Sequence, residues 1–215
     1  MTTTLMGGSP GTLDRYPIAV GYPRVRKPRL VNVPDRRCFA IQGLGTPGGP
    51  EFQEAMGALY GAAYSLHFLL RDRGIDAHTG PSEGLWERLD GETDWSEGEV
   101  AFDPAAWRWT LLLPVPDEAS AEDIAAALAV ARRRRPTPAL ERLGVLTLAE
   151  GLVVEAMHVG PYATEPETIA AMHALAERDG LVPAGPHHEL YLGDPYKTAP
   201  ERLRTVLRQP VKPAT

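Results

Sequence analysis

The most restrictive feature of this 215-residue chain is an order of predicted elements that occurs twice. A strand over residues 38–43 leads into a glycine- and proline-rich loop, then a helix that stops at a glycine, and then short strands. The same order returns from residue 151 onward, although the two halves share little residue identity. The repeat predicts an α+β fold with pseudo-twofold symmetry, built from duplicated strand-helix-strand-strand modules.

These modules divide the chain into four parts that together form one domain. We expect an extended N-terminal arm, a first half-module, a linking helix and a second half-module over residues 1–37, 38–116, 117–145 and 146–215. Two half-modules side by side leave a central cleft between them. Clefts of this kind are common binding sites for small ligands.

Helix boundaries are marked by capping and stop signals. The first long helix is predicted over residues 51–73, with apolar positions spaced by three or four, and Gly74 stops it. Ser120 is an N-cap signal for the linking helix. Thr164 and Glu167 have the spacing of a capping box at the start of the second long helix.

Composition excludes several classes of protein. The chain has 22 basic and 28 acidic residues, a net charge of −6, which disfavours nucleic-acid binding. Its one cysteine, Cys38, allows neither a disulfide framework nor a cysteine zinc site, and its apolar neighbours predict a buried position. No signal peptide or apolar membrane span is evident, so we expect a cytoplasmic protein. No sequence feature assigns an oligomeric state.

Glu189 is the first candidate for chemistry. In the predicted strand HHELYL, alternation places Glu189 and Tyr191 on one face and His188, Leu190 and Leu192 on the other. The second, mostly apolar set is expected to face the helices, which leaves the first pair in the cleft. A buried carboxylate there has a raised pKa and can act as a base toward water or attract a cation. An ion-paired or solvated structural carboxylate is the alternative.

The first long helix carries a second candidate group. Tyr60, Tyr64 and His67 occur at spacings of four and three, so they share one helix face. The two tyrosines can extend their hydroxyl groups to a cleft and stack against a flat ligand. The alternative is that they are boundary residues with an apolar body and a hydrated tip.

Further candidates lie on and after predicted strands. Trp107 and Trp109 share one strand face and can form an aromatic box with Trp86, suited to planar or cationic molecules. Ordinary core packing explains the same pattern. His158 and Tyr162 flank the second glycine loop, although a lone histidine beside apolar residues is usually a hydrogen-bonded core residue.

Motifs for cofactor chemistry are absent from the sequence. There is no nucleophile elbow, phosphate-binding loop or dinucleotide fingerprint. Adjacent strand residues such as His187, His188 and Glu189 point in opposite directions and cannot easily hold one ion. We therefore expect neither a metal nor a cofactor.

The C-terminal run HHELYLGDPYKTAPERLRTVLRQPV resembles the signature of the GyrI-like small-molecule-binding family. The segments RLVNVPDRRCFAIQG, PSEGLWERLD and MHVGPYATEP are similar to the stand-alone branch of this family, so the resemblance covers residues 13–212. It implies two strand-helix-strand-strand modules around a ligand cleft. In relatives fused to DNA-binding helices, a glutamate at the position of Glu189 is implied to bind cationic drugs.

The stand-alone branch is similar to proteins that hydrolyse cyclopropanoid genotoxins of the spirocyclopropyl-cyclohexadienone type. The resemblance implies a metal-independent hydrolase for detoxification or self-resistance. Glu189 would deprotonate a water, and the hydroxyl of Tyr64 would hydrogen-bond the dienone oxygen. Tyr60, Tyr162 and Tyr191 remain alternatives to Tyr64. The branch carries lysine where this chain has His67, which leaves the role of that position open.

Two other functions stay in view. A drug-binding module that sequesters a flat aromatic or cationic molecule needs the same cleft without turnover. A protein-interaction role, such as the gyrase binding that the family name suggests, would rest on an acidic surface. Acidic residues are dense only over residues 83–99, which we interpret as a solvated loop.

Overall fold

A computed structural model of the chain describes residues 3–5, 16–17, 19, 21–24, 26–89 and 107–214. The α-helices are α1 (Pro50–Arg71), α2 (Ala121–Arg134), α3 (Pro138–Arg142) and α4 (Glu165–Arg178), and two short 3-10 helices are η3 (Tyr162–Thr164) and η4 (Pro200–Arg202). The strands are β1 (Thr3–Leu5), β2 (Arg29–Val33), β3 (Arg36–Leu44), β4 (Glu83–Arg88), β5 (Trp107–Pro114), β6 (Gly144–Leu148), β7 (Gly151–Val159), β8 (Leu181–Pro183), β9 (His187–Tyr191) and β10 (Arg204–Pro213).

The local signals in the sequence account for most helix ends. Gly74 and Gly180 follow α1 and α4 with φ angles of 79° and 70°, in the left-handed region that favours glycine. Ser120 forms the predicted capping box of α2 with Asp123. The capping box predicted at Thr164 is wrong, because its hydroxyl donates instead to the carbonyl oxygen of Pro161 within η3 at 2.8 Å.

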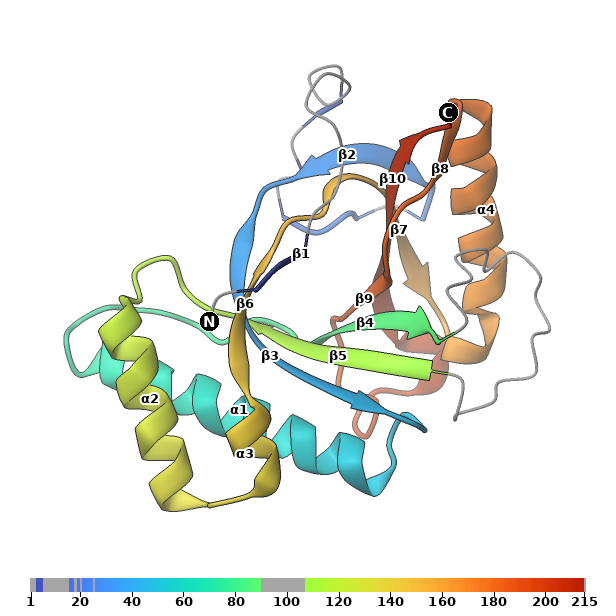
Figure 1. The fold of residues 1–215 in the computed structure, drawn as a ribbon. Coiled ribbons are helices and arrows are strands. Elements are labelled where there is room, and N and C mark those ends of the chain that lie inside the picture. The colour runs from blue at the N-terminus through green and yellow to red at the C-terminus, as the bar shows by residue number, and fades with distance from the viewer. Residues whose placement is uncertain are drawn as a thin grey trace.

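The strands form one mixed sheet, and their order in the sheet shows the predicted duplication. The order β6-β3-β5-β4-β9-β10-β7-β2 reads as two mirrored sets that meet where β4 pairs antiparallel with β9. β3, β4 and β5 in the first half correspond to β7, β9 and β10 in the second. The sheet curls strongly, and the helices lie outside the curl (Figure 1). The α+β class and the pseudo-twofold arrangement are therefore confirmed.

The two halves exchange their outer strands. β2 leads within two residues into β3, yet it pairs with β7 of the other half. β6 similarly precedes β7 but pairs with β3. Part of the predicted N-terminal arm is thus a strand of the sheet. This exchange ties both halves together at the two ends of the sheet as well as at its centre.

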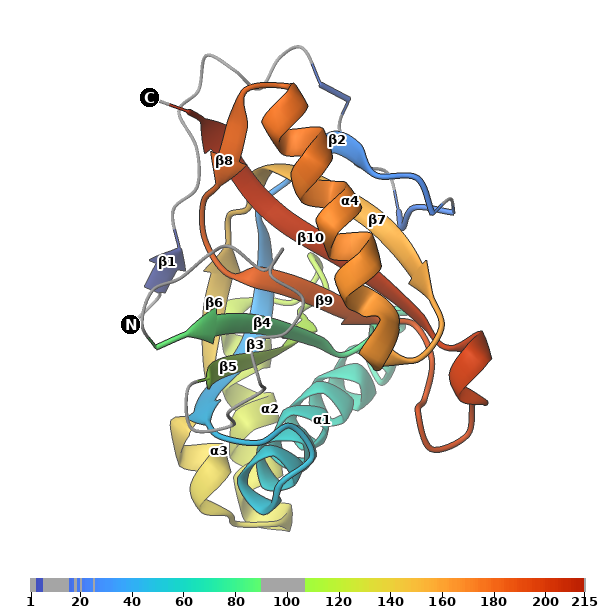
Figure 2. The same ribbon diagram turned by 90° about the vertical axis from the view of Figure 1, so that its right-hand side faces the viewer.

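Both long helices cover the same face of the sheet. Leu111 of β5 packs in a cluster with α1, and Leu207 of β10 packs in a cluster with α4. Figure 2 shows α4 lying over β7 and β10. Cross-strand register places Glu189 opposite Gly84 on one side and opposite Leu207 on the other, so Glu189 is on this helix-covered face. The expectation that His188 and Leu190 face the helices is therefore wrong. Those residues lie on the opposite, inner face of the curl.

No helix in the described part of the chain combines the length and apolar character needed to cross a bilayer.

Candidate functional site

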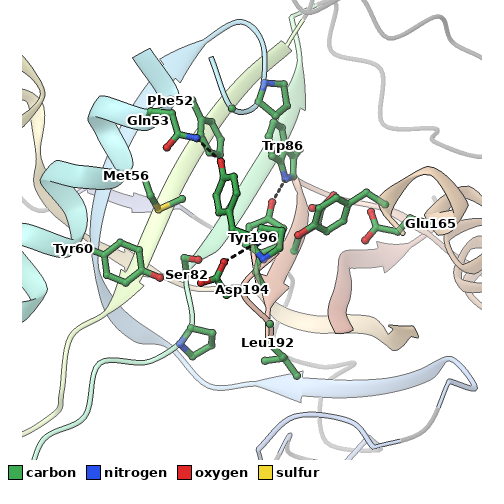
Figure 3. Close-up of a pocket in the computed structure, with 18 of the residues that line it drawn as sticks. Phe52, Gln53, Met56, Tyr60, Ser82, Trp86, Glu165, Leu192, Asp194 and Tyr196 are labelled. Atoms are coloured by element: carbon green, nitrogen blue, oxygen red, sulfur yellow. Dashed lines mark hydrogen bonds between the residues drawn. The ribbon is translucent and has the colours of Figure 1, made fainter. Parts of the chain in front are cut away.

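A cavity of about 1350 Å³ lies between α1, α4 and the centre of the sheet. α1 supplies one wall and the start of α4 the facing wall, while β4, β5 and β9 form the floor. Residues 193–196, which follow β9, border the same space (Figure 3). The cavity is thus at the junction of the two halves, where the duplicated fold places its cleft.

Seven of the ten residues proposed from the sequence line this cavity: Tyr60, Tyr64, Trp86, Trp107, Tyr162, Glu189 and Tyr191. Tyr64 stands at its rim, with 51% of the residue exposed, and its ring stacks on Tyr60 at 6.1 Å. Trp86 and Trp107 are buried in the floor. The ring of Tyr162 meets that of Tyr191 edge to face at 6.1 Å. These side chains give the cavity aromatic surfaces on several sides.

The other three proposed residues lie elsewhere. His67 bonds to the carbonyl oxygen of Ala77, because it lies about two turns along α1 from Tyr60, roughly 10 Å away and beyond the cavity rim at Tyr64. Trp109 is fully buried and packs edge to face on Phe52 at 5.3 Å. His158 bonds to the hydroxyl of Thr168 at 2.9 Å. All three are structural residues, and their assignment to ligand binding is corrected.

Glu189 is held by two aromatic side chains. The hydroxyl of Tyr191 hydrogen-bonds to the Glu189 carboxylate, and the indole Nε1 of Trp86 donates to the Tyr191 hydroxyl at 3.2 Å. Burial raises the pKa of Glu189 to about 7, although the Tyr191 hydrogen bond and the charge of His188 act to lower it. Only 16% of the Glu189 side chain is exposed. A carboxylate with these properties is suited to take a proton near neutral pH.

The arrangement of Trp86 and Tyr191 requires a glycine at position 84. A Cβ atom there would lie 3.0 Å from both the Trp86 Nε1 and the Tyr191 hydroxyl. Gly84 is the cross-strand partner of Glu189, so the space above it is where the two aromatic side chains meet. The sequence shows a glycine inside a strand, which is a signal of close approach, but not what approaches.

A second buried carboxyl group, Glu165, was not identified from the sequence. It is the first residue of α4 and lines the cavity with only 6% of its surface exposed. Burial and the negative charge of Glu189 raise its pKa to about 9, against a hydrogen bond with Thr205. Its position at a helix N-terminus favours the ionised form by up to about 2 kcal/mol. In sequence it looks like an ordinary first-turn acid.

The segment after β9 crosses the mouth of the cavity. Tyr196 is 82% exposed, and its hydroxyl accepts a hydrogen bond from the Gln53 amide of α1 at 3.1 Å (Figure 3). The Asp194 carboxylate accepts from the Tyr196 backbone N–H at 2.9 Å and fixes the turn. One side-chain bond therefore connects this segment to the opposite wall.

Comparison with known proteins identifies the family that has this fold. The family model for the GyrI-like small molecule binding domain matches residues 26–212. The chain belongs to the GyrI-like family. No curated protein matches it.

Solved structures with the same fold support the assignment of this chain to the GyrI-like family. It is 36% identical to an uncharacterized conserved protein from Listeria innocua, with a TM-score of 0.78 over 87% of this chain and 93% of that one. It is 34% identical to a hydrolase from Listeria innocua, with a TM-score of 0.75 over 88% and 94%. The C-terminal domain of EcmrR shares the fold at 11% identity, with a TM-score of 0.52 over 91% and 100%.

Behind the cavity floor, this GyrI-like chain buries a network of charges on the inner face of the sheet. His188 bonds to Glu83 at 3.0 Å and to Glu150 at 2.7 Å, and Arg36 forms two hydrogen bonds with Glu83. Burial acts to lower the pKa of His188, but the two carboxylates outweigh it and raise that pKa. The network continues through Arg208 to Glu155 at 3.1 Å.

This network corrects the interpretation of residues 83–99 as a solvated loop. Glu83 is fully buried in an ion pair rather than solvated, and residues 90–99 lie outside the described part of the chain. In the described residues, no group of three or more His, Cys, Asp or Glu side chains is arranged to hold a metal ion.

Proposed function

We propose that this GyrI-like protein is a metal-independent hydrolase that opens a spirocyclopropyl-cyclohexadienone by adding water. The observation that carries the proposal is a buried carboxylate, Glu189, fixed by Tyr191 and Trp86 in an aromatic-walled cavity. The 34% identity to a hydrolase across most of both chains supports a hydrolytic reaction. The biological role we propose is detoxification of, or self-resistance to, a reactive natural product.

The proposed reaction uses Glu189 as a general base. Its carboxylate takes a proton from water while the water oxygen forms a bond to the methylene carbon of the cyclopropane. The strained C–C bond breaks, its electron pair enters the ring, and the former dienone oxygen becomes a phenolate. A hydrogen bond from the Tyr64 hydroxyl stabilises that charge. Glu189 then releases its proton to solvent and the phenolate takes one up, so the product is the substrate plus one water.

The walls of the cavity fit a flat substrate. Trp86, Trp107 and Tyr60 all line the cavity, and Trp86 stacks on Phe52 with centroids 6.4 Å apart. Aromatic faces bind a planar dienone by stacking and exclude water from all but the reacting carbon. The volume of about 1350 Å³ is large enough for a multi-ring compound.

The test is a mass-spectrometric turnover assay with an excess of a duocarmycin-type compound. Purified wild-type protein, Glu189→Gln, and the matched control Glu167→Gln on the exposed side of α4 are compared. We expect many turnovers to a product heavier by one water, and a loss of about 10²- to 10⁴-fold in Glu189→Gln alone. Full turnover by a folded Glu189→Gln protein would refute the mechanism.

A non-catalytic drug-binding module is the second candidate. This function is favoured by the excess of acidic side chains in the cavity lining. Among the described lining residues the acidic ones are Glu165, Glu189 and Asp194, and the one arginine is Arg88. Aromatic walls with excess negative charge suit a flat cation. Unchanged compound that co-purifies with the protein one to one would identify this function instead.

A further inference from the structure

The Glu165 carboxyl group has an unusual environment for an ionised acid. Its Oε1 atom is buried and has no hydrogen-bond partner among the described residues. Thr205 of β10 is the hydrogen-bonding side chain at this carboxyl group. A charged oxygen left without a partner in a buried position is costly, whereas a neutral carboxyl group tolerates that position better.

Among the described residues, no cation in the cavity lining is paired with either glutamate, and the positive charge that acts on Glu189 is that of His188 on the other face of β9. In the part of the chain that the structure describes, neither carboxylate is ion-paired to a lysine or arginine, and Arg88 is the one basic side chain in the cavity lining. Glu165 is instead faced by Glu189 of β9, with Tyr162, Tyr191 and Asp194 also in the lining. His187 lies 3.8 Å from Glu189, but burial lowers its pKa to about 3, so it stays neutral.

Figure 3 shows Glu165 on the side of the cavity opposite Tyr60 and Met56. It comes from the α4 wall, while Glu189 comes from the floor. Both carboxyl groups therefore reach the same space from different elements. The negative charge of Glu189 acts to raise the pKa of Glu165.

We propose that Glu165 is a second catalytic carboxyl group, which stays protonated and orients the attacking water for Glu189. This inference rests on the proposed function. One O–H of the water donates to the Glu189 carboxylate and the other to the Glu165 carboxyl group, which lines the same cavity. The Glu165 proton does not move during the step, so the bonds formed and broken are those already given. A neutral Glu165 avoids competing with Glu189 for the water proton.

At neutral pH, the carboxyl groups of Glu165 and Glu189 together hold one proton. Two like charges in one buried site cannot easily coexist, so the second acid holds its proton to higher pH. The raised pKa values of Glu189 and Glu165 agree with this order of titration. Were both groups ionised, the cavity would instead be a binding site for a cation.

The first test does not depend on turnover. Glutamate carboxyl carbons are isotope-labelled and titrated by NMR in the wild-type protein, with Glu165→Gln and Glu167→Gln used to assign signals. We expect the Glu165 signal to titrate above neutral pH, and to move to lower pH in Glu189→Gln because the neighbouring charge is gone. An ordinary wild-type titration of Glu165, or one unaffected by Glu189→Gln, overturns the proposal.

The second test uses the pH profile of turnover of the duocarmycin-type compound, corrected for the reaction without protein. Wild type should lose rate above about pH 9, where Glu165 ionises. Glu165→Gln keeps a neutral acceptor, so we expect about a two- to threefold lower rate and no alkaline loss, and about a tenfold lower rate for Glu165→Ala. An alkaline loss that persists in Glu165→Gln, or an unimpaired Glu165→Ala, contradicts the role. If wild type shows no turnover, the proposed function fails while the NMR titration still decides how Glu165 is protonated.

Discussion

The indole Nε1 of Trp86 donates a hydrogen bond of 3.2 Å to the hydroxyl oxygen of Tyr191, across the β4–β9 junction that joins the two halves of the sheet. The Tyr191 hydroxyl is then free to direct its own proton to Glu189. This relay passes from a first-half residue to the base proposed in the second half. The contact between the two halves of the fold therefore helps to position the proposed base.

Trp86→Phe keeps an aromatic ring but removes the donor to Tyr191. We expect turnover to fall by about three- to tenfold, the equivalent of one net hydrogen bond, with a smaller change in KM. A double-mutant cycle with Tyr191→Phe measures the coupling through kcat. If the two effects simply add, the two side chains act independently and the relay is refuted.

Acidic conditions should remove activity through Glu189. Its folded-state pKa is raised to about 7, so the basic form is lost as the pH falls through that value. The rate then falls about tenfold for each further pH unit, measured as kcat/KM for the duocarmycin-type compound. The neutral His187 cannot produce this limb, because its pKa is near 3. A flat profile down to pH 5 would exclude Glu189 as the base.

Gln53→Ala removes the side-chain bond that connects α1 to Tyr196 across the cavity mouth. The segment opens more readily, and we expect ligand dissociation to accelerate by about two- to fivefold. Stopped-flow quenching of tryptophan fluorescence measures the rate. Tyr196→Phe should have the same effect, and adding Gln53→Ala to it should change nothing more. Equal dissociation rates in all four proteins would show that the bond does not retain the ligand.

Glu83→Gln removes one carboxylate from the network behind the cavity floor. Arg36 and His188 would then share a buried site with one negative charge fewer. We expect a loss of about 3–5 kcal/mol in the free energy of unfolding, measured by urea denaturation. The exposed Glu118→Gln should change stability by less than about 0.5 kcal/mol. A similar small change for Glu83→Gln would mean that the pair is dispensable.

Substitution by alanine should have opposite effects on stability at Gly43 and Gly57. A Cβ atom on Gly43 would lie 2.2 Å from the Trp109 ring, so Gly43→Ala forces the buried indole to move. We expect a loss of about 3 kcal/mol or more in the free energy of unfolding. Gly57 is exposed in α1 with nothing near its Cβ position, and Gly57→Ala should stabilise by about 0.5–1 kcal/mol. Equal effects in thermal unfolding would contradict this contrast.

The sequence by itself determined the local elements and their order. Apolar spacing predicted α1, glycines predicted where both long helices stop, and strand alternation placed Glu189 and Tyr191 on one face. These properties depend on residues a few positions apart, so short-range sterics and periodicity are sufficient to reveal them.

Only the tertiary structure decided what lies on each face. Alternation states which residues share a face but not what packs on it, so the covered face of β9 was assigned to the wrong residues. Trp86 and Tyr191 are 105 positions apart, as are Glu83 and His188, and strand pairing brings each pair together. The same assembly sets Glu165 across from Glu189 and leaves His67, Trp109 and His158 outside the cavity. Burial and neighbouring charge, which decide the protonation of these acids, arise only when distant segments meet.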